Sequence, residues 1–140
     1  MSRLFWDTNL FIYLWEDFGS LSNQVLALRN RMLVRGDELF TSAITLGEIL
    51  VKPLQNHDAK AVTYYQNLIA TTAALIPFEE KAALAYARLR SDRAIRAPDA
   101  IQLACAAAAG VDLFITNDIR LHSKQVPGIQ FIVPLDRVPI

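Results

Sequence analysis

The segment Leu4-Phe5-Trp6-Asp7-Thr8-Asn9 joins a short apolar run to a polar turn, and the organisation of the whole chain can be worked out from that junction. Three consecutive apolar residues predict a short buried strand. Thr8 or Asn9 can then cap a helix over residues 10–15, which is rich in apolar and aromatic side chains. An acidic side chain, Asp7, therefore stands between a strand and a helix.

Similar junctions recur along the chain. Leu39-Phe40-Thr41 predicts a second strand, with Ser42 as the cap of a helix that Pro53 ends. Further strands are expected at 74–76, 113–116 and 130–133, and further helices at 25–34, 60–71, 78–90 and from Pro98 to Gly110. Strands that alternate with helices predict an α/β fold with a mostly parallel central sheet covered on both faces, which is a three-layer α/β/α arrangement. We expect one domain over residues 1–140.

The composition favours a folded protein but says little about partners. The chain is 53% hydrophobic and 20% charged, and its 14 basic and 14 acidic residues balance, which neither demands nor excludes a nucleic-acid partner. The single cysteine, Cys105, excludes an intrachain disulfide and fits a reducing compartment. No apolar stretch approaches the ~18 residues of a membrane span, and no small-residue cleavage site follows the apolar N-terminus. We expect a soluble, cytoplasmic protein with no membrane partner.

Four acidic residues stand at strand ends or on helices that follow strands: Asp7, Glu48, Asp99 and Asp118. The carboxyl ends of parallel strands meet at one edge of a sheet, where ligands of open α/β sheets bind. Carboxylates gathered there repel one another unless a cation neutralises them or some take up protons. Because the ligands are oxygens and no Cys/His cluster is present, Mg²⁺ or Mn²⁺ is preferred over Zn²⁺.

Each acid taken alone has an ordinary structural explanation. Asp7 can cap a helix, Asp99 can stabilise a helix start after Pro98, and Asp118 can form an Asx turn. Glu48 lies beyond the first turn of its helix, where the surrounding apolar residues favour an inward-pointing carboxylate. The repetition of acids in equivalent positions, rather than any single one, favours a functional site.

Four short motifs, in this order, resemble those of PIN-domain ribonucleases: Asp7-Thr8-Asn9, Thr45-Leu46-Gly47-Glu48-Ile49, Pro98-Asp99-Ala100-Ile101-Gln102-Leu103-Ala104 and Thr116-Asn117-Asp118. Any one motif is weak, but four in order are specific, and they span nearly the whole chain. The small single-domain form resembles VapC-type toxins of bacterial and archaeal toxin–antitoxin pairs. Trp6 departs from the family, which more often has a smaller aliphatic residue before the first aspartate.

The resemblance implies a PIN-like fold and Mg²⁺- or Mn²⁺-dependent hydrolysis of RNA. It implies that the catalytic and metal-binding residues are Asp7, Glu48, Asp99 and Asp118, that Thr116 and Asn117 support them, and that Thr8 and Asn9 fix the surrounding loops. Asp7 and Asp99 are expected to be the principal ligands, with the other two acids completing the site directly or through water. The resemblance also implies a cognate antitoxin whose tail covers the active site, and a homodimer.

Two groups of basic residues flank the predicted site: Arg88, Arg90, Arg93 and Arg96 before Asp99, and Arg120, His122 and Lys124 after Asp118. They are either solvated surface or contacts to an RNA backbone, which would be independent of base sequence. His57 and His122 are isolated in the sequence, which favours ordinary surface histidines.

The aromatic residues leave two explanations open. Phe11, Tyr13 and Trp15, or Tyr64 and Tyr65, could form the surfaces for an antitoxin or a second copy of the chain, and core packing explains several of them equally well.

Two other functions fit parts of the pattern. A non-catalytic PIN-like RNA-binding or scaffold module is expected to lose one or more of the four acids, and this chain keeps them all. A small metal-dependent phosphatase with Asp7 as nucleophile usually has a second acid two residues later, where Asn9 stands.

Overall fold

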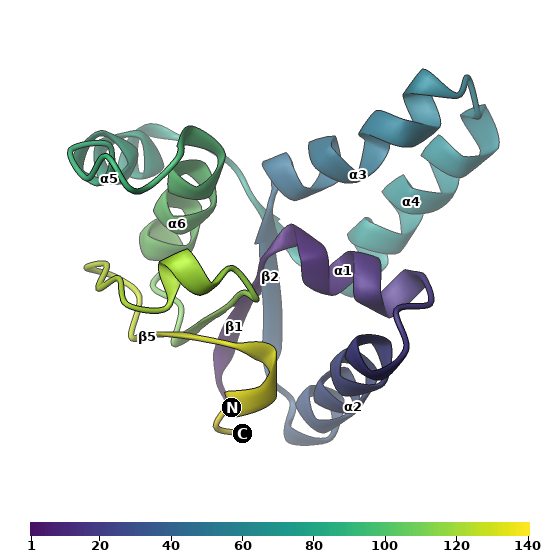
Figure 1. Cartoon of the computed structure of the whole chain (residues 1–140), viewed down its shortest axis with the longest axis horizontal. Coiled ribbons are helices and arrows are strands. Elements are labelled where there is room, and N and C mark those ends of the chain that lie inside the picture. Colours follow the sequence, from purple (N-terminus) through teal and green to yellow (C-terminus); the bar gives the residue numbers. More distant parts are fainter.

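The computed structural model describes residues 1–140 and contains a five-stranded parallel sheet between layers of helices (Figure 1). The strands are β1 (Arg3–Trp6), β2 (Glu38–Ser42), β3 (Ala74–Ile76), β4 (Leu113–Ile115) and β5 (Phe131–Val133). Their order across the sheet is β3-β2-β1-β4-β5, and every neighbouring pair is parallel. The predicted three-layer α/β fold with a parallel sheet is confirmed.

The helices are α1 (Thr8–Trp15), α2 (Ser20–Arg35), α3 (Ala43–Gln55), α4 (Ala59–Thr72), α5 (Glu80–Leu89) and α6 (Ala97–Ala109), with two 3₁₀ turns, η1 (Ile119–Leu121) and η2 (Leu135–Arg137). Helices α5 and α6 lie on one side of the sheet and α1 and α2 on the other, while α3 and α4 form a hairpin that projects outward (Figure 1). No helix is both long and apolar enough to cross a membrane.

The two faces of the sheet build two separate cores. Successive side chains of a strand point to opposite faces. In β1, Phe5 packs with α6 in one core, whereas Leu4 and Trp6 pack with α1 and α2 in the other. Strand β4 follows the same alternation, and its Phe114 stacks on Phe5 with ring centroids 5.0 Å apart. Strands β1 and β4 are therefore buried on both faces, as their apolar runs predict, whereas the edge strands β3 and β5 are partly exposed.

Several predicted helix boundaries are wrong. Helix α1 begins at Thr8 and α2 at Ser20, earlier than the predicted residues 10 and 25. Pro53 lies inside α3, which continues to Gln55. Proline removes only its own N–H from the helix, and Asn56 still donates its N–H to the carbonyl of Lys52 at 2.9 Å. The final turn therefore closes around the proline, and the chain leaves the helix only after it.

Trp6 and Phe11 are core residues and not partner surfaces. Both are fully buried, and their rings pack with centroids 5.3 Å apart. Trp6 has its indole Nε1 without a hydrogen-bond partner. The large residue before Asp7 is therefore accommodated by the core beneath α1.

The parallel register brings the functional strand ends to one edge of the sheet. Trp6 lies beside Ile115, and Phe5 beside Phe40. The N–H of Asp7 donates to the carbonyl of Ile115 at 3.0 Å, which continues the ladder by one residue. Residues that follow β1, β2 and β4 consequently meet at the carboxyl edge.

Candidate active site

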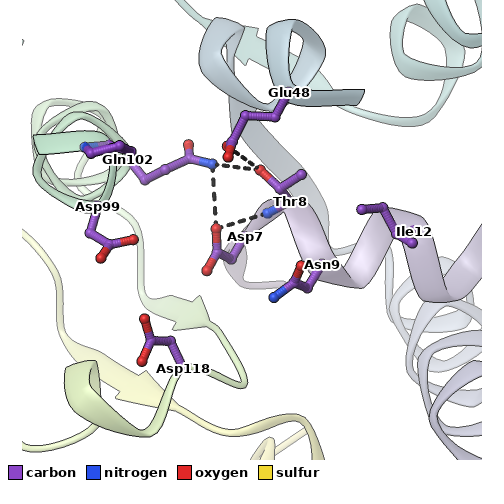
Figure 2. A pocket seen from close by; sticks show the side chains of 9 residues that line it. Asp7, Thr8, Asn9, Ile12, Glu48, Asp99, Gln102 and Asp118 are labelled. Carbon is purple, nitrogen blue, oxygen red and sulfur yellow. Dashed lines mark hydrogen bonds between the residues drawn. The ribbon is translucent and has the colours of Figure 1, made fainter. Parts of the chain in front are cut away.

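One pocket at the carboxyl edge of β1 collects all four predicted acids (Figure 2). It has a volume of about 290 Å³ and is lined by Asp7, Thr8, Asn9, Ile12, Glu48, Pro98, Asp99, Gln102 and Asp118. Only Ile12 among these is a large apolar residue. The pocket is therefore built to hold polar or charged groups.

The topology explains why the pocket lies here. Strands β2 and β3 follow β1 on one side, whereas β4 and β5 lie on the other. Ligands of open α/β sheets bind where the strand order reverses in this way, beyond the carboxyl ends of the strands. Asp7 follows β1 and Asp118 follows β4, so both stand at that reversal.

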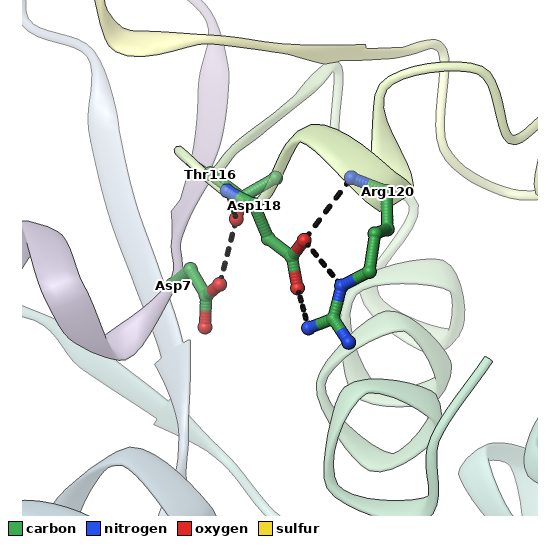
Figure 3. A network of polar contacts seen from close by, with 4 residues as sticks. All are labelled: Asp7, Thr116, Asp118 and Arg120. Atoms are coloured by element: carbon green, nitrogen blue, oxygen red, sulfur yellow. Dashed lines mark hydrogen bonds and ion pairs between the residues drawn. The ribbon is translucent and has the colours of Figure 1, made fainter. Parts of the chain in front are cut away.

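Asp7 is held by donors on both carboxylate oxygens. Its Oδ1 accepts the backbone N–H of Thr8 at 2.8 Å, and its Oδ2 accepts the hydroxyl of Thr116 at 2.7 Å (Figures 2 and 3). The first bond also makes Asp7 the N-cap of α1. The capping role and the pocket role are therefore compatible, and both fix the side chain in one direction.

Burial nevertheless raises the pKa of the Asp7 carboxyl above its ordinary value, and the nearby charge of Asp118 adds to the rise. The hydrogen bonds from Thr116, from the Thr8 backbone and from Gln102 act in the opposite direction without cancelling it. Asp7 is thus a firmly oriented carboxylate whose negative charge is not fully compensated by the protein.

Glu48 reaches the pocket from α3. As a residue it is exposed, yet its carboxyl group points into the pocket, in the inward direction that the sequence suggests. Its Oε1 accepts the hydroxyl of Thr8 at 2.8 Å, which directs the carboxyl group into the pocket. Partial burial of that group raises its pKa, and the charges of Asp7 and Asp99 reinforce the rise against the Thr8 hydrogen bond.

Asp99 stands in the first turn of α6 and faces the pocket from the opposite side (Figure 2). Burial raises its pKa, with further increases from the charges of Asp118 and Asp7. The positive charges of Arg120 and Arg96 lower it by less. Three acids from three different helices or helix starts therefore share an excess of negative charge.

Asp118 behaves differently because it has a cationic partner. Arg120 donates from Nε to Oδ1 at 2.9 Å and from Nη2 to Oδ2 at 2.6 Å, and its backbone N–H also donates to Oδ1 at 3.1 Å (Figure 3). The side-chain hydrogen bonds to Arg120 hold the pKa of Asp118 below its ordinary value. Arg120, predicted as a candidate RNA contact, is thus paired with an acid of the pocket.

The supporting residues divide between the pocket and the loops. Thr8 and Thr116 bind acids directly, and Thr116 also accepts the N–H of Asp118 at 3.0 Å. Asn9 is exposed at the pocket wall. Asn117 faces away from the acids, since its Oδ1 accepts the N–H of Leu135 at 3.1 Å and so ties the loop after β4 to η2.

Sequence reasoning missed the residue with the most contacts in the pocket, Gln102. Its Nε2 lies 3.4 Å from Asp7 Oδ1, 3.2 Å from Thr8 Oγ1 and 2.7 Å from Thr45 Oγ1, while its Oε1 accepts the hydroxyl of Ser42. A usable signal existed, because Gln102 is the one amide in the otherwise small and apolar run from Ala100 to Ala109. It also stands one helical turn after Asp99.

The predicted basic residues do not form one surface. Arg88 and Lys124 line a separate cavity of about 440 Å³ beside α5, where Lys124 pairs with Asp92 at 2.9 Å. Arg90 donates to the carbonyl of Ile95 at 2.8 Å. Arg93 and Arg96 are exposed and make no ion pair. Arg88 is likewise exposed and unpaired, but Arg96 is the arginine of the first group whose charge acts on the acids Asp99 and Asp118.

The acids fit a divalent cation by chemistry, although they do not form a closed cage. No group of three or more Asp, Glu, His or Cys side chains is placed so that it could hold a metal ion by itself. Mg²⁺ does not require such a cage, because it is usually held by one or two carboxylates and keeps several waters. The donors are all oxygens, and a cation would favour the charged forms of Asp7, Glu48 and Asp99, whose pKa values are raised chiefly by burial and further by mutual repulsion.

A larger groove adjoins the acidic pocket and shares Asn9, Ile12 and Glu48 with it. Its volume is about 770 Å³, and it runs between α1, α3 and α4. The aromatic residues Tyr13, Trp15 and Tyr65 line it, and the Trp15 and Tyr65 rings lie 6.1 Å apart. Tyr64 points outward and is 59% exposed.

Comparison with protein families identifies the chain. The PIN domain family matches it over residues 4–126, and the protein therefore belongs to that family. No curated protein sequence matches it.

Solved structures with a similar fold come from several bacteria. VapBC-1 from nontypeable Haemophilus influenzae superposes with a TM-score of 0.71 at 18% identity, covering 96% of this chain and 99% of that chain. VapBC2 from Rickettsia felis, bound to a DNA fragment from its promoter, gives a TM-score of 0.70 at 18% identity, with 94% and 98% covered. VapBC-5 from Mycobacterium tuberculosis, a member of the VapBC family of toxin–antitoxin systems, gives a TM-score of 0.61 at 21% identity. The match covers 94% of this chain and 98% of that chain.

Proposed function

We propose that this PIN-domain protein is a divalent-metal-dependent endoribonuclease and the toxin of a toxin–antitoxin pair. The observation that carries the proposal is the single pocket that gathers Asp7, Glu48, Asp99 and Asp118, with raised pKa values for the first three. Carboxyl groups so perturbed in a cleft are typical of functional sites. The similarity of the whole fold to VapBC proteins supports the toxin assignment.

In the proposed mechanism, Asp7 and Asp99 would hold Mg²⁺ or Mn²⁺, and Glu48 and Asp118 would complete the site directly or through water. The ion supplies, when bound, stabilisation of the charge that develops on phosphate oxygens and favours ionisation of the attacking water. Thr116 and Thr8 keep Asp7 in a fixed orientation throughout. Asp118 keeps Arg120 beside the pocket, where its positive charge can face a phosphate.

The substrate contacts proposed for RNA centre on Arg93 and Arg96. Both are exposed and lie just before Asp99 in the chain, and the negative charge of the pocket itself would repel a phosphate backbone. The charge of Arg96 already acts on Asp99 and Asp118, and exposed arginines of this kind supply the sequence-independent attraction that such a backbone needs. An RNA substrate and a chain whose one cysteine is free both fit action in the cytoplasm.

The proposed antitoxin contact is the groove between α1, α3 and α4. It combines aromatic walls with the acidic residues Glu16, Glu48 and Asp58, and it opens into the acidic pocket. Such a groove suits a tail with apolar anchors and a basic residue that reaches the carboxylates. The expected homodimer stays a prediction that rests on the family resemblance.

The central test is cleavage of RNA by purified protein with Mg²⁺ or Mn²⁺. We expect cleavage that is abolished by chelation and by Asp99→Asn, while the control Asp136→Asn, at an exposed acid far along the chain, keeps full activity. Hydrolysis of small phosphate esters without RNA cleavage would instead support a phosphatase. RNA binding without any cleavage would support a non-catalytic module.

The substrate path is tested by salt. Each phosphate contact to single-stranded RNA contributes about 0.7 to the slope of log affinity against log salt. Arg93→Ala combined with Arg96→Ala should weaken RNA binding and flatten that slope by about 1.4. An unchanged slope would mean that the RNA follows another path.

The toxin assignment is tested by growth. Expression of the wild-type chain alone should arrest growth, and co-expression of the small protein encoded beside it should restore growth. Normal growth with intact, folded protein in the cell would argue for a housekeeping nuclease.

A further inference from the structure

We propose that Gln102 is a positioning residue that sets the direction of a buried chain of hydroxyl groups ending on the two carboxylates Asp7 and Glu48. This inference rests on the proposed function, because it concerns how those carboxylates are presented to a metal ion. Gln102 is 2% exposed and lies on α6, whereas its partners belong to the ends of β1 and β2 and to the helices that follow them.

The contacts form a continuous path through the base of the pocket. Gln102 Nε2 donates to Thr45 Oγ1 at 2.7 Å, Thr45 Oγ1 lies 3.1 Å from Thr8 Oγ1, and Thr8 Oγ1 donates to Glu48 Oε1 at 2.8 Å. A branch from the same amide reaches Asp7 Oδ1 at 3.4 Å (Figure 2). Thr8 and Thr45 are 7% and 0% exposed, so water is largely excluded from the part of the path between Gln102 and Thr8, whereas its Glu48 end faces the pocket.

Donor counting fixes the direction of this path. A hydroxyl has one hydrogen to donate, and an ionised carboxylate can only accept. Thr8 gives its hydrogen to Glu48, so Thr45 is the donor where the two threonine hydroxyls meet. Thr45 accepts from Gln102 and also from the hydroxyl of Thr41 at 2.8 Å, which leaves its own hydrogen for Thr8. The hydrogen bonds therefore run from Gln102 through two threonines to Glu48.

Gln102 is the member that can impose this direction, because its amide has a donor end and an acceptor end that do not exchange roles. Its Oε1 accepts from Ser42, which leaves Nε2 facing Thr45, Thr8 and Asp7. If the amide were turned over, its carbonyl oxygen would face the Asp7 carboxylate, and the donors at the base of the pocket would be lost. Only one orientation satisfies both ends.

The consequence is that one amide orients two acids that approach the pocket from different elements. Without the Gln102 donor, the Thr45 hydroxyl is free to turn away, and Thr8 is no longer required to point at Glu48. Partners that orient metal ligands in this way typically change metal affinity or activity by 10- to 100-fold when removed. The same change in a residue that only fills space would alter stability and leave metal affinity unchanged.

The test uses four variants that separate the hydrogen-bond path from packing. Gln102→Met keeps the side-chain length and removes the amide. Thr45→Val keeps the shape of threonine and removes the hydroxyl, whereas Thr45→Ser keeps the hydroxyl and serves as the matched rescue. Ala43→Ser, at an exposed position of the same helix α3, is the surface control. Thermal unfolding without metal reports stability, and calorimetry with Mn²⁺ reports metal affinity.

We expect Gln102→Met and Thr45→Val each to raise the dissociation constant for Mn²⁺ by about 10- to 100-fold. Both should lower kcat for RNA cleavage with little change in KM, while Thr45→Ser and Ala43→Ser stay within about threefold of wild type. Thr45→Val keeps the test decisive if Gln102→Met fails to fold. Wild-type Mn²⁺ affinity in Thr45→Val, or an equal loss in Thr45→Ser, overturns the proposal while the nuclease assignment stands.

A metal-free measurement separates this proposal from the proposed function. The side-chain amide protons of Gln102 should exchange slowly with solvent in the wild type and in Thr45→Ser, and faster in Thr45→Val. If wild-type protein binds no Mn²⁺ and cleaves no RNA, the proposed function fails, and the exchange rates still decide whether the path exists. Rapid exchange in the wild type would overturn it.

Discussion

The two edges of the central sheet both carry aspartates, but they treat them in opposite ways. At the amino edge, Asp37 precedes β2 and accepts hydrogen bonds from the backbone of Ser2 at 2.6 Å and from Arg35 Nε at 2.9 Å. At the carboxyl edge, Asp7 follows β1 and accepts only neutral donors, from Thr8, Thr116 and Gln102. One acid is neutralised by the fold, and the other is left with excess charge.

The pKa values follow this difference. Burial acts to raise the pKa of Asp37, but the bonds from Arg35 and Ser2 and the charge of Arg35 outweigh it and hold the pKa below its ordinary value. At Asp7 burial prevails, and the pKa is raised. Asp112, which precedes β4, resembles Asp37 in accepting a backbone N–H, that of Arg3 at 2.8 Å. The amino edge uses acids to tie the first residues of the chain to the sheet.

The difference teaches that position at a sheet edge does not by itself identify a functional acid. What distinguishes the carboxyl edge is that several acids meet with too few cations, so that their charges work against the stability of the fold. A protein keeps such an arrangement where a bound ion restores the balance. Proteins commonly give up some stability at sites of this kind.

The difference between the two edges can be tested by substitution, and we expect the largest effect from Asp7→Asn. The change removes a charged ligand from the proposed metal site, so cleavage of RNA and binding of Mn²⁺ should fall to background. The free energy of unfolding without metal should be unchanged or higher, by up to about 1 kcal/mol, because an incompletely compensated buried charge is removed. Urea unfolding at neutral pH and calorimetry with Mn²⁺ measure the two effects on the same sample. A marked loss of stability would show that Asp7 is chiefly a structural cap.

The matched change at the other edge, Asp37→Asn, should do the reverse. It breaks the ion pair with Arg35 and weakens the bond to Ser2, and hydrogen bonds to a buried charged group of this kind contribute about 1–3 kcal/mol. We expect that loss in the free energy of unfolding, with the affinity for Mn²⁺ and the cleavage rate unchanged. If Asp37→Asn also weakened Mn²⁺ binding, Asp37 at the amino edge would affect the acidic pocket at the carboxyl edge, and the two edges would not have separate roles.

Much of the fold could be predicted from local signals in the sequence. The apolar runs at 4–6, 39–41 and 74–76 lie within observed strands, and Ser42 caps the helix that follows, as predicted. The cap of α1 is Asp7 and not Thr8 or Asn9. These signals work because a doubly buried strand must be apolar throughout and because a helix start needs a side-chain acceptor. The end of α3 was mispredicted because Pro53 falls in the last turn, where the loss of one N–H does not stop the helix.

The candidate site was predicted only in part. The four acids line one pocket as expected, and their role as metal ligands stays a prediction. The hydrogen bonds that orient them could not be predicted, because Gln102 and Thr45 are 57 residues apart and Thr116 and Asp7 are 109 apart. Such contacts depend on which strands become neighbours, and strand order is not encoded in local periodicity.

Arg120 shows a different limit, because its partner is only two residues away. The sequence places it among candidate phosphate contacts, but it does not reveal that the turn at η1 folds the guanidinium onto Asp118. Asp37 was not predicted as a notable acid, because it precedes a strand. The four predicted acids follow an apolar strand or lie on a helix. Both cases turn on side-chain pairing rather than on secondary structure.

The contrast between the edges can be sharpened with pH. Because folding raises the pKa of Asp7, its unfavourable contribution is complete at neutral pH, declines as pH falls through the raised value, and is absent below the ordinary value of 3.8. The favourable contribution of Asp37, whose pKa is lowered, is complete above 3.8 and is lost only as pH falls through the lower value.

Two trends should therefore separate in urea unfolding between about pH 7 and pH 3. Any stability advantage of Asp7→Asn over the wild type should shrink before pH 3.8 is reached. The penalty of Asp37→Asn should persist to that pH and shrink below it. Parallel pH profiles for the two variants would contradict the assignment of opposite shifts.

The smallest expected effect comes from Arg120→Gln, which makes Asp118 more like its unpaired neighbours. The arginine is 49% exposed, so water screens the ion pair and its loss should change stability little. Its loss frees the Asp118 carboxylate and removes a positive charge from the rim of the pocket.

The change should also affect metal binding. Two unit charges about 4 Å apart in water-like surroundings interact by about 1 kcal/mol, so removal of the repelling arginine should let Mn²⁺ bind up to about fivefold more tightly. Calorimetry beside the control Arg137→Gln, whose contact with Asp136 is 3.9 Å and exposed, isolates this effect from a general change in net charge. If Mn²⁺ bound more weakly to Arg120→Gln and not to the control, Arg120 would be needed to hold the Asp118 carboxylate in the position where it binds the metal ion. The ion pair would then favour metal binding and not oppose it.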